Sequence, residues 1–163
     1  MIRPYDATRD ADGLWALKRA FELGLGAGTG GDEKAATYRE KLDGDYRGRY
    51  LAWVDRCVAD DERCVQVAEV DGDLVGYVFV LPEDLAMIWD AAVLNEVFVD
   101  PAHRGTGVAD DLFAAALALA RDQDLPLDRI VLDVDEANER AQAFYRRHGF
   151  DHWGEMVARP LTE

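Results

Sequence analysis

The sequence predicts an α/β fold, an α+β sandwich in which helices flank a mixed and mostly antiparallel sheet of six to seven strands. The elements follow in the order strand, two helices, three strands, helix, strand, helix and strand. A hairpin rich in β-branched and aromatic residues lies in the middle of the chain, and a long apolar-faced helix follows the next buried strand. At 163 residues the chain fits a single domain that spans 1–163.

The amino-terminal stretch predicts a strand and a helix. Ile2 to Tyr5 is a short strand, and Asp10 or Asp12 then precedes an apolar-periodic helix. This helix is expected to end in the cluster from Gly24 to Gly31, where six of eight residues are Gly or Ala. The cluster has GxGxxG spacing but follows a helix, so it is not a dinucleotide fingerprint. We expect a flexible linker there or, alternatively, a mobile lid over the substrate.

A second helical region is expected from Asp32 to Val58, interrupted near Gly44 and Gly48. Its apolar side is rich in aromatic rings, which either pack in the core or line an acceptor pocket if these helices border the site. These apolar and aromatic residues are Tyr38, Leu42, Tyr46, Tyr50, Leu51 and Trp53.

The hydrophobic period then becomes that of strands. A hairpin is expected from Cys64 to Val70 and Leu74 to Leu81, because Asp71-Gly72-Asp73 suits a tight turn. The elements expected after the hairpin are strands at Ala92 to Val99, Arg129 to Val134 and Trp153 to Ala158, and helices at 107–122 and Glu139 to His148.

The charge balance is strongly acidic, with 33 Asp and Glu against 18 Lys and Arg and a net charge of -15. A field of this sign repels polyanions, so neither nucleic acid nor an anionic membrane is expected as a partner. The few lysines and many aspartates predict an acidic surface adapted to salt, that is, a halophilic protein. No signal peptide or membrane-length apolar run is recognisable, so a cytoplasmic location is expected.

The cysteines and histidines do not indicate a metal site. Cys57 and Cys64 could form a disulfide, but two thiols are the simpler expectation for this domain size. His148 and His152 are four residues apart, yet they straddle Gly149, where a helix is expected to end. Because the two imidazoles would not share a helical face, no metal is predicted.

A candidate anion site follows the strand that ends at Val99. Gly105 and Gly107 let the backbone come close to a ligand, and the next helix presents unpaired N–H groups in its first turn. These groups and the helix dipole favour a phosphate. From the loop alone, an ordinary strand-to-helix turn explains the glycines equally well.

Two motifs carry a resemblance to a known family. Arg104-Gly105-Thr106-Gly107-Val108-Ala109 resembles the R/Q-x-x-G-x-G/A signature of the GNAT superfamily of N-acetyltransferases. The stretch from Asn138 to Phe150 resembles the later helix of that family, which opens with Asn, carries Tyr near its end and closes with Gly-Phe. The resemblance implies a GNAT-like acyl-coenzyme A N-acyltransferase fold, with acetyl-coenzyme A as the cosubstrate.

The resemblance also implies roles for individual residues. The pyrophosphate would lie on the N–H groups of the signature. The pantetheine arm would pair with the strand at Val97 and Val99, in the gap where this strand diverges from the strand at 129–134. Tyr145 would be the general acid that protonates the departing thiolate, since a phenol of pKa about 10 is protonated at neutral pH; the alternative is a core tyrosine. The cofactor-binding residues expected in this way are Val97, Phe98, Val99, Arg104, Gly105, Thr106, Gly107, Val108, Ala109, Asn138 and Tyr145.

Glu96 is singled out by the residues around it. A strand covered on both faces should be continuously apolar, yet Asn95 and Glu96 interrupt this one. The carboxylate could act as a base, because an alkyl ammonium of pKa about 10.4 is neutral in only about one of a few thousand molecules at pH 7. A structural carboxylate paired with an Arg, or one that selects a cationic substrate, explains Glu96 equally well.

Two acidic residues depart from the family pattern. Asp110 and Asp111 follow the signature, where the family often has a basic or small residue. Acids suit a helix N-terminus but repel phosphates, so both side chains are expected to point away from the ligand.

These observations predict an N-acetyltransferase that passes an acetyl group from acetyl-coenzyme A to a primary amine of a small molecule or peptide. Transfer is expected to be direct, because no Cys or Ser lies at the loop as an obvious nucleophile. The alternatives are a non-catalytic coenzyme A binding or regulatory module with the same fold, and a small acid-rich interaction protein. Dimers are frequent in the family, so a homodimer stays open, and the acceptor is not identified.

Overall fold

The computed structural model of the protein describes residues 1–28, 42 and 45–162. The chain forms two compact units, Met1–Asp133 and Val134–Glu163. Each is described by itself, and a single domain over 1–163 stays a prediction.

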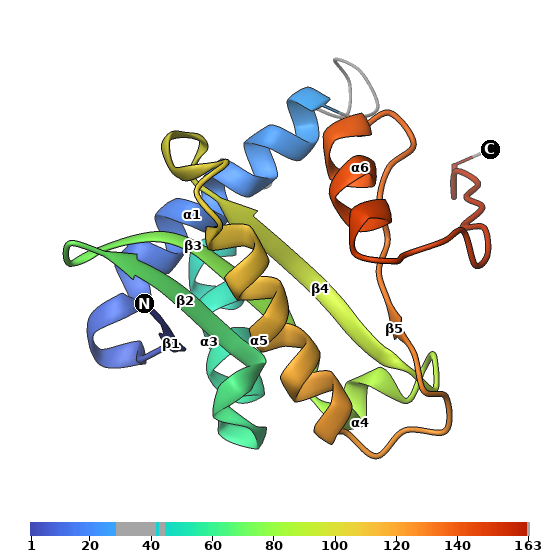
Figure 1. Ribbon diagram of the computed structural model, residues 1–163, viewed down its shortest axis with the longest axis horizontal. Helices are drawn as coiled ribbons and strands as arrows, with labels where there is room; N and C mark the ends of the chain where they lie inside the picture. The colour runs from blue at the N-terminus through green and yellow to red at the C-terminus, as the bar shows by residue number, and fades with distance from the viewer. Residues whose placement is uncertain (29–41, 43–44, 163) are drawn as a thin grey trace. The chain divides into compact units, whose positions relative to one another are not determined.

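The first unit is built around a sheet whose strands lie in the order β1-β2-β3-β4-β5 (Figure 1). β1 to β4 pair antiparallel, and β5 runs parallel to β4. The mixed, mostly antiparallel sheet is confirmed, but it has five strands rather than six to seven. The strands are β1 Ile2–Pro4, β2 Val65–Val70, β3 Asp73–Val80, β4 Ala92–Val99 and β5 Ile130–Val131.

Helices cover both faces of this sheet. In Figure 1, α5 lies in front of the sheet, and α1 and α3 lie behind it. Aromatic rings pack the layer behind: Phe21 of α1 lies 6.5 Å from Tyr77, and Trp53 of α3 lies 5.1 Å from Phe79, between ring centroids. The helices and short turns of the unit are α1 Ala7–Gly28, α3 Tyr46–Asp60, η1 Glu62–Cys64, α4 Glu83–Ala86, η2 Pro101–His103 and α5 Val108–Asp122.

Helix α1 is longer than predicted at both ends. It begins at Ala7, because the Asp6 carboxylate accepts hydrogen bonds from the Thr8 amide and hydroxyl at 2.9 and 2.7 Å. It continues to Gly28, so the linker expected from residue 24 onward is helical in its first half. Each glycine costs a helix only about 1 kcal/mol, which an already formed helix can sustain. Residues 29–31 lie outside the described residues, and so does the expected helix over 32–41.

Helix α3 also differs from its prediction. Gly48 lies inside the helix and does not interrupt it, whereas position 44 is outside the described residues. The hairpin is confirmed: Val70 pairs with Asp73, and Asp71 and Gly72 have φ values of 52° and 86°. Positive φ at both central residues is the geometry of a type I′ turn, which Asp-Gly favours.

The second unit contains α6, Glu139–Arg147. Asn138 caps it by accepting a hydrogen bond from the Ala141 amide at 3.2 Å, and Gly149 ends it with a φ of 89°. The strand predicted at 153–158 is wrong, because this segment has no regular structure and Val157 is 86% exposed. A strand needs a neighbouring backbone to bond with, and side-chain propensity alone does not supply one.

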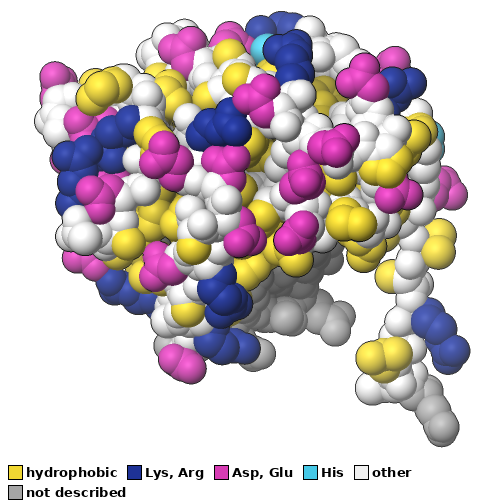
Figure 2. All heavy atoms as spheres, turned by 90° about the horizontal axis from the view of Figure 1, so that it is seen from below, with side chains coloured by type: hydrophobic (Ala, Val, Ile, Leu, Met, Phe, Trp, Pro, Cys, Tyr) yellow, Lys and Arg dark blue, Asp and Glu magenta, His cyan; other side chains and the backbone are white. Residues whose placement is uncertain are grey.

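Other sequence-based expectations concern membranes, thiols and metals. No described helix has the length and apolar character to cross a bilayer. Cys57 and Cys64 are buried free thiols, and burial raises their pKa values to about 11 and about 12. Among the described residues, no group of three or more His, Cys, Asp or Glu could hold a metal ion. Figure 2 shows one face of the molecule, where acidic side chains are spread between basic and apolar ones.

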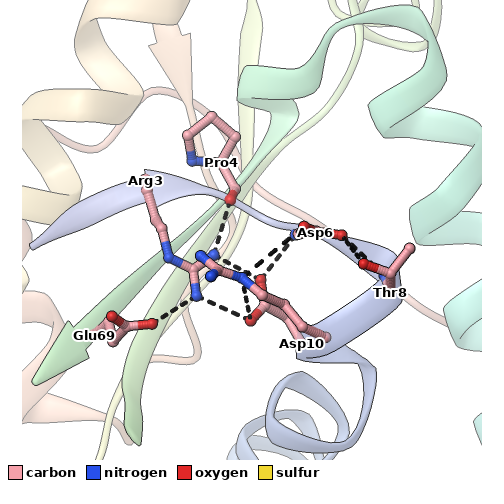
Figure 3. A network of polar contacts seen from close by, with 7 residues as sticks. Arg3, Pro4, Asp6, Thr8, Asp10 and Glu69 are labelled. Atoms are coloured by element: carbon pink, nitrogen blue, oxygen red, sulfur yellow. Dashed lines mark hydrogen bonds and ion pairs between the residues drawn. The ribbon is translucent and has the colours of Figure 1, made fainter. Parts of the chain in front are cut away.

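A partly buried ion-pair network ties the first strand to its neighbours (Figure 3). The Arg3 guanidinium donates to both oxygens of Asp10 at 2.7 and 2.9 Å and to Glu69 at 2.8 Å. The Asp6 amide donates to Asp10 at 2.8 Å. The hydrogen bonds from Arg3 hold the pKa of Asp10 below its usual value. The network therefore joins β1, the start of α1 and β2.

Replacing Asp10 by Asn should destabilise the protein by about 3 kcal/mol, because it leaves a largely buried guanidinium without its main partner. Since the folded pKa of Asp10 is lowered, its contribution is complete above the unfolded pKa of about 3.9 and is lost as the pH falls through the folded pKa. Urea denaturation from pH 7 to pH 3 should show the difference from wild type shrinking in acid.

The control is Asp12→Asn, because Asp12 pairs with Arg47 but its side chain is 90% exposed. This change should leave stability nearly unaltered. Equal losses in the two variants would show that the Arg3 network has no special weight.

Gly76 of β3 allows the close approach of the sheet and α5. A Cβ at this position would lie 2.9 Å from the Phe98 carbonyl oxygen and 3.1 Å from Leu112 Cδ1. The backbone contact cannot move without distorting β4. Glycine at this position therefore fixes how tightly α5 packs on β3 and β4.

Gly76→Ala is expected to cost about 1–3 kcal/mol of stability through this overlap. Gly24→Ala is the matched control, since a Cβ there meets nothing within 4 Å and alanine favours a helix by about 0.5–1 kcal/mol. Urea denaturation should give shifts of opposite sign, and a neutral Gly76→Ala would refute the packing argument.

Candidate active site

Strand β4 contains a bulge that begins the candidate site. Phe79 pairs with Glu96, and the next residue Val80 pairs with Leu94, so Asn95 is an extra residue on β4. A bulge bends its strand and interrupts the ladder. Pairing with β5 stops just before it, because only Ala92 and Val93 have partners on that side. The two parallel strands therefore separate at the bulge.

The separated edge of β4 carries backbone groups that do not bond to β3. The Asp100 amide donates to the Val75 carbonyl at 2.8 Å, which fixes the alternation of the antiparallel ladder. Residues 96, 98 and 100 therefore face β3, while Val97 and Val99 turn their N–H and C=O groups to the open edge. Arg104 Nε donates to the Val99 carbonyl at 3.0 Å, in agreement with this alternation.

The three predicted strand residues, Val97, Phe98 and Val99, differ in the side to which their backbone groups point. Val97 presents an N–H and a C=O to the open edge, whereas the Val99 carbonyl already accepts from Arg104. The Phe98 backbone faces β3, and its ring packs 6.2 Å from the Phe21 ring. An extended ligand along this edge would therefore meet Val97 and Val99 rather than Phe98.

The predicted loop leads from this edge into α5. Gly105 and Gly107 have φ values of 78° and 90°, and Gly107 is the N-cap of α5 without a side-chain cap. A Cβ added at either glycine would meet nothing within 4 Å, so the space over the loop is open. The Thr106 hydroxyl donates to the His103 carbonyl at 2.5 Å, which closes the turn. The loop therefore continues directly from the strand edge, and the binding roles expected of these residues stay predictions.

The first turn of α5 supplies the donors of the loop. The Asp111 amide donates to the Gly107 carbonyl at 3.0 Å, so the intrahelical bonds begin there. The amides before it are the ones that a helix start leaves without intrahelical partners. Asp110 is half-buried and Asp111 is exposed, and the expectation that both point away from a ligand stays a prediction.

Glu96 lies at the centre of a buried polar cluster, and its side chain is only 7% exposed. Its Oε1 accepts from the hydroxyls of Tyr50 and Tyr77, both at 2.8 Å. Its Oε2 accepts from Lys18 Nζ at 2.8 Å and, more weakly, from the Asn95 amide at 3.4 Å. The partner of Glu96 is thus a lysine and not the arginine considered from the sequence.

Lys18 is the cation of this cluster. Its Nζ also donates to Glu22 at 2.5 Å and lies 4.8 Å and 5.2 Å from the ring centroids of Tyr50 and Phe21. Burial lowers its pKa, but Glu96 and Glu22 outweigh burial and raise it above the usual value. Lys18 is therefore charged at neutral pH although it is buried.

Sequence reasoning missed Lys18, Glu22 and Tyr77 as partners of Glu96. A signal was present, because Lys18 and Glu22 are four residues apart on the helical side that carries Leu14, Leu17 and Phe21. Charges on an apolar face need buried partners of opposite sign. Glu96 in turn interrupts an apolar strand. The charged residues on the apolar face of α1 and the carboxylate in β4 could therefore have been predicted to pair.

The second unit holds the other predicted residues, Asn138 and Tyr145. The Asn138 side-chain oxygen is engaged in capping α6. Tyr145 is half-buried, its ring lies edge-on to Phe144 and Phe150, and burial raises its pKa to about 12. The phenol therefore stays protonated throughout the physiological pH range.

A surface hollow elsewhere in the first unit is distinct from these groups. It is lined by residues at the carboxyl end of α5, among them Leu119, Asp122 and Gln123. Helix α5 has 15 residues, so about 20 Å of helix separates this hollow from the loop.

Known proteins are similar to this chain in sequence and in fold. The family model described as "Acetyltransferase (GNAT) family" matches residues 32–150. An uncharacterized N-acetyltransferase of Mycobacterium tuberculosis is 32% identical over 143 residues, which cover 86% of this chain and 83% of that protein. Mycothiol acetyltransferase of Salinispora tropica is 46% identical over 70 residues, but these span only 22% of its length.

Solved structures agree on the fold. The PaiA N-acetyltransferase of Thermoplasma acidophilum, in complex with coenzyme A, superposes with a TM-score of 0.71 at 19% identity, over 93% of this chain and 89% of that one. A ribosomal-protein-alanine N-acetyltransferase of Brucella melitensis gives a TM-score of 0.69 at 22% identity, over 94% and 86%. The match of the family model and the 32% identity over most of two chains show that this protein belongs to the GNAT family of N-acetyltransferases.

Proposed function

We propose that this GNAT enzyme transfers the acetyl group of acetyl-coenzyme A directly to a primary amine, with Tyr145 acting on the leaving thiolate. The observation that carries the proposal is the open edge of β4 at Val97 and Val99, which leads into the loop at Gly105 and Gly107. An edge with unpaired amides suits an extended amide-containing arm. A loop of approachable N–H groups at a helix start suits a pyrophosphate.

The residues present fit such a cosubstrate. Both glycines leave open space above the backbone, and the first turn of α5 has no side-chain cap of its own. Arg104 is exposed next to the loop, where a cation can approach phosphate oxygens. Val97, Val99, Arg104 and the amides from Gly105 to Ala109 would hold the coenzyme, and the bound thioester would supply the activated acetyl group.

The reaction forms two bonds, N–C and S–H, and breaks two, C–S and N–H. The acceptor nitrogen, as a free amine, bonds to the acetyl carbon, the carbon–sulfur bond breaks, the nitrogen loses a proton and the sulfur gains one. Tyr145 is assigned to the sulfur by its place in the 138–150 motif. Since its pKa of about 12 exceeds that of a thiol near 8.5, its main effect is a hydrogen bond to the developing thiolate.

The chemistry of the site favours a holding role for Glu96 over a role as base. A base needs a free lone pair directed at the substrate proton, and each Glu96 oxygen already accepts two hydrogen bonds. Its nearest cation is Lys18, so a cationic acceptor would have to compete with a buried ammonium.

The acceptor is to be found by measuring coenzyme A release against a panel of amines. Relatives and structural neighbours include a ribosomal-protein-alanine N-acetyltransferase and an aminoglycoside N-acetyltransferase. The panel should therefore contain peptides with a free N-terminus, aminoglycosides, amino acids and polyamines. Binding of acetyl-coenzyme A without turnover on any amine would favour the non-catalytic alternative.

Gly107→Ala should weaken coenzyme A binding at least tenfold, because a Cβ would fill the space over the loop and strain a residue with φ of 90°. The matched control is Gly72→Ala in the β2–β3 turn, which has a φ of 86° and equally open space. Calorimetry should find that both changes cost similar stability, while only the first raises Kd. Equal Kd values would place the coenzyme elsewhere.

Tyr145→Phe should lower kcat by about 100-fold and leave the Kd for coenzyme A nearly unchanged, since it removes only the donor to the leaving sulfur. Coenzyme A release at saturating amine measures this effect. Tyr5→Phe is the matched control, because Tyr5 is a buried tyrosine whose pKa, like that of Tyr145, is raised to about 12. A kcat equal to wild type in Tyr145→Phe would remove the assignment.

A further inference from the structure

The Lys18 cluster consists of Lys18, Glu22, Tyr50, Tyr77 and Glu96, contributed by α1, α3, β3 and β4. Within it Glu96 accepts three bonds of 2.8 Å, from one ammonium and two phenols. The Asn95 amide, on the bulge, is the fourth donor at 3.4 Å. A carboxylate offers about four acceptor positions, so this one is saturated.

Saturation by these donors opposes protonation of Glu96. An ammonium has three donors and no acceptor, so a proton placed on Oε2 would face Lys18 without a partner. A proton on Oε1 would displace one of the two phenols, which would lose its acceptor. Leaving a buried donor unbonded is costly, so the arrangement is stable only with Glu96 ionised.

Of the groups that face Glu96 from the neighbouring elements, the ammonium and the two phenols favour the same ionised state, whereas the Glu22 carboxylate opposes it. Lys18 and Glu22 come from α1, Tyr50 comes from α3 with the Tyr46 ring stacked 6.2 Å away, and Tyr77 comes from β3. Burial, together with the charge of Glu96, raises the pKa values of Tyr50 and Tyr77 above the usual value. Both phenols therefore remain donors wherever the enzyme works.

We propose that Lys18 is a positioning residue for acetyl transfer: its buried ammonium locks Glu96 as a fully bonded anion that anchors the bulge of β4 and takes no proton from the acceptor. The catalytic meaning of this inference rests on the proposed function. The locked state itself is a property of the folded protein and can be tested without turnover.

The first test compares the pH dependence of stability in wild type, Lys18→Met and Lys18→Arg. Without the ammonium, burial favours the neutral carboxyl over the anion at this position of the folded protein. A carboxyl with a raised folded pKa stabilises at low pH, and that contribution is lost as the pH rises. The unfolding constant of Lys18→Met should therefore grow by up to tenfold per pH unit between pH 5 and pH 8, relative to wild type.

Controls assign the effect to Glu96. Lys18→Met with Glu96→Gln should lose the part of the added pH dependence that Glu96 contributes, whereas Lys18→Met with Glu22→Gln should keep that part. Lys18→Arg retains the charge and should follow wild type. Mere loss of packing would lower stability equally at every pH, so an unchanged pH dependence in Lys18→Met would overturn the proposal.

A measurement on wild type covers the case in which Lys18→Met does not fold. With ¹³C-labelled glutamate, the Glu96 carboxyl resonance, identified through Glu96→Gln, should not titrate between pH 5 and pH 9. A midpoint in that range would show that Glu96 exchanges a proton at working pH, and the proposal would fall.

The last test measures enzyme activity, once an acceptor is found. The rise of kcat/KM with pH should follow the pKa of the acceptor amine. The pH profile of Lys18→Arg should show no additional ionisation. An acid limb that persists when the acceptor pKa is changed and is absent in Glu96→Gln would identify Glu96 as the base and overturn the proposal. If no amine is acetylated, the proposed function fails, while the stability and resonance experiments still decide whether Lys18 locks Glu96.

Discussion

The extra residue in β4 is the constraint on which the first unit depends. Asn95 interrupts the β3–β4 ladder at the point where β4 loses its pairing with β5. After the bulge, Glu96 faces α1 and α3, while the backbone of Val97 and Val99 faces the open edge. One insertion thus separates a buried charged cluster on one side from a polar backbone edge on the other.

The bulge also explains why two polar residues interrupt an otherwise apolar strand. Glu96 is tolerated inside because three neighbouring elements, α1, α3 and β3, bring donors to it. The Lys18 ammonium is in turn tolerated because two carboxylates and two ring faces surround it. Each charge would be costly alone, and each is stable through the other.

The sequence predicted the elements whose local chemistry is strong. The Asp71-Gly72 turn, the limits of β4 and the caps of α6 at Asn138 and Gly149 follow from rules that act over a few residues. The motif at 104–109 also led to the loop and to the family. These features do not depend on which segments are neighbours in space.

The features that sequence reasoning missed depend on distant contacts. The start of α1 was misplaced because Asp10 appeared to be a cap, whereas it pairs with Arg3 across 7 residues and Asp6 caps the helix. The closing strand at 153–158 has suitable side chains but no bonded neighbour. The partner of Glu96 is Lys18, which is 78 residues away along the chain. Periodicity does not report such pairs.

The start of α5 has a consequence for how the enzyme persists. Gly107 places no side chain on the amides of the first turn, although most helices that need a stable start use Ser, Thr, Asp or Asn there. A phosphate bound at this position would act as the cap that the chain omits. The coenzyme concentration and the free energy of unfolding would then be linked, so that more of the enzyme would stay folded at a high coenzyme concentration than at a low one.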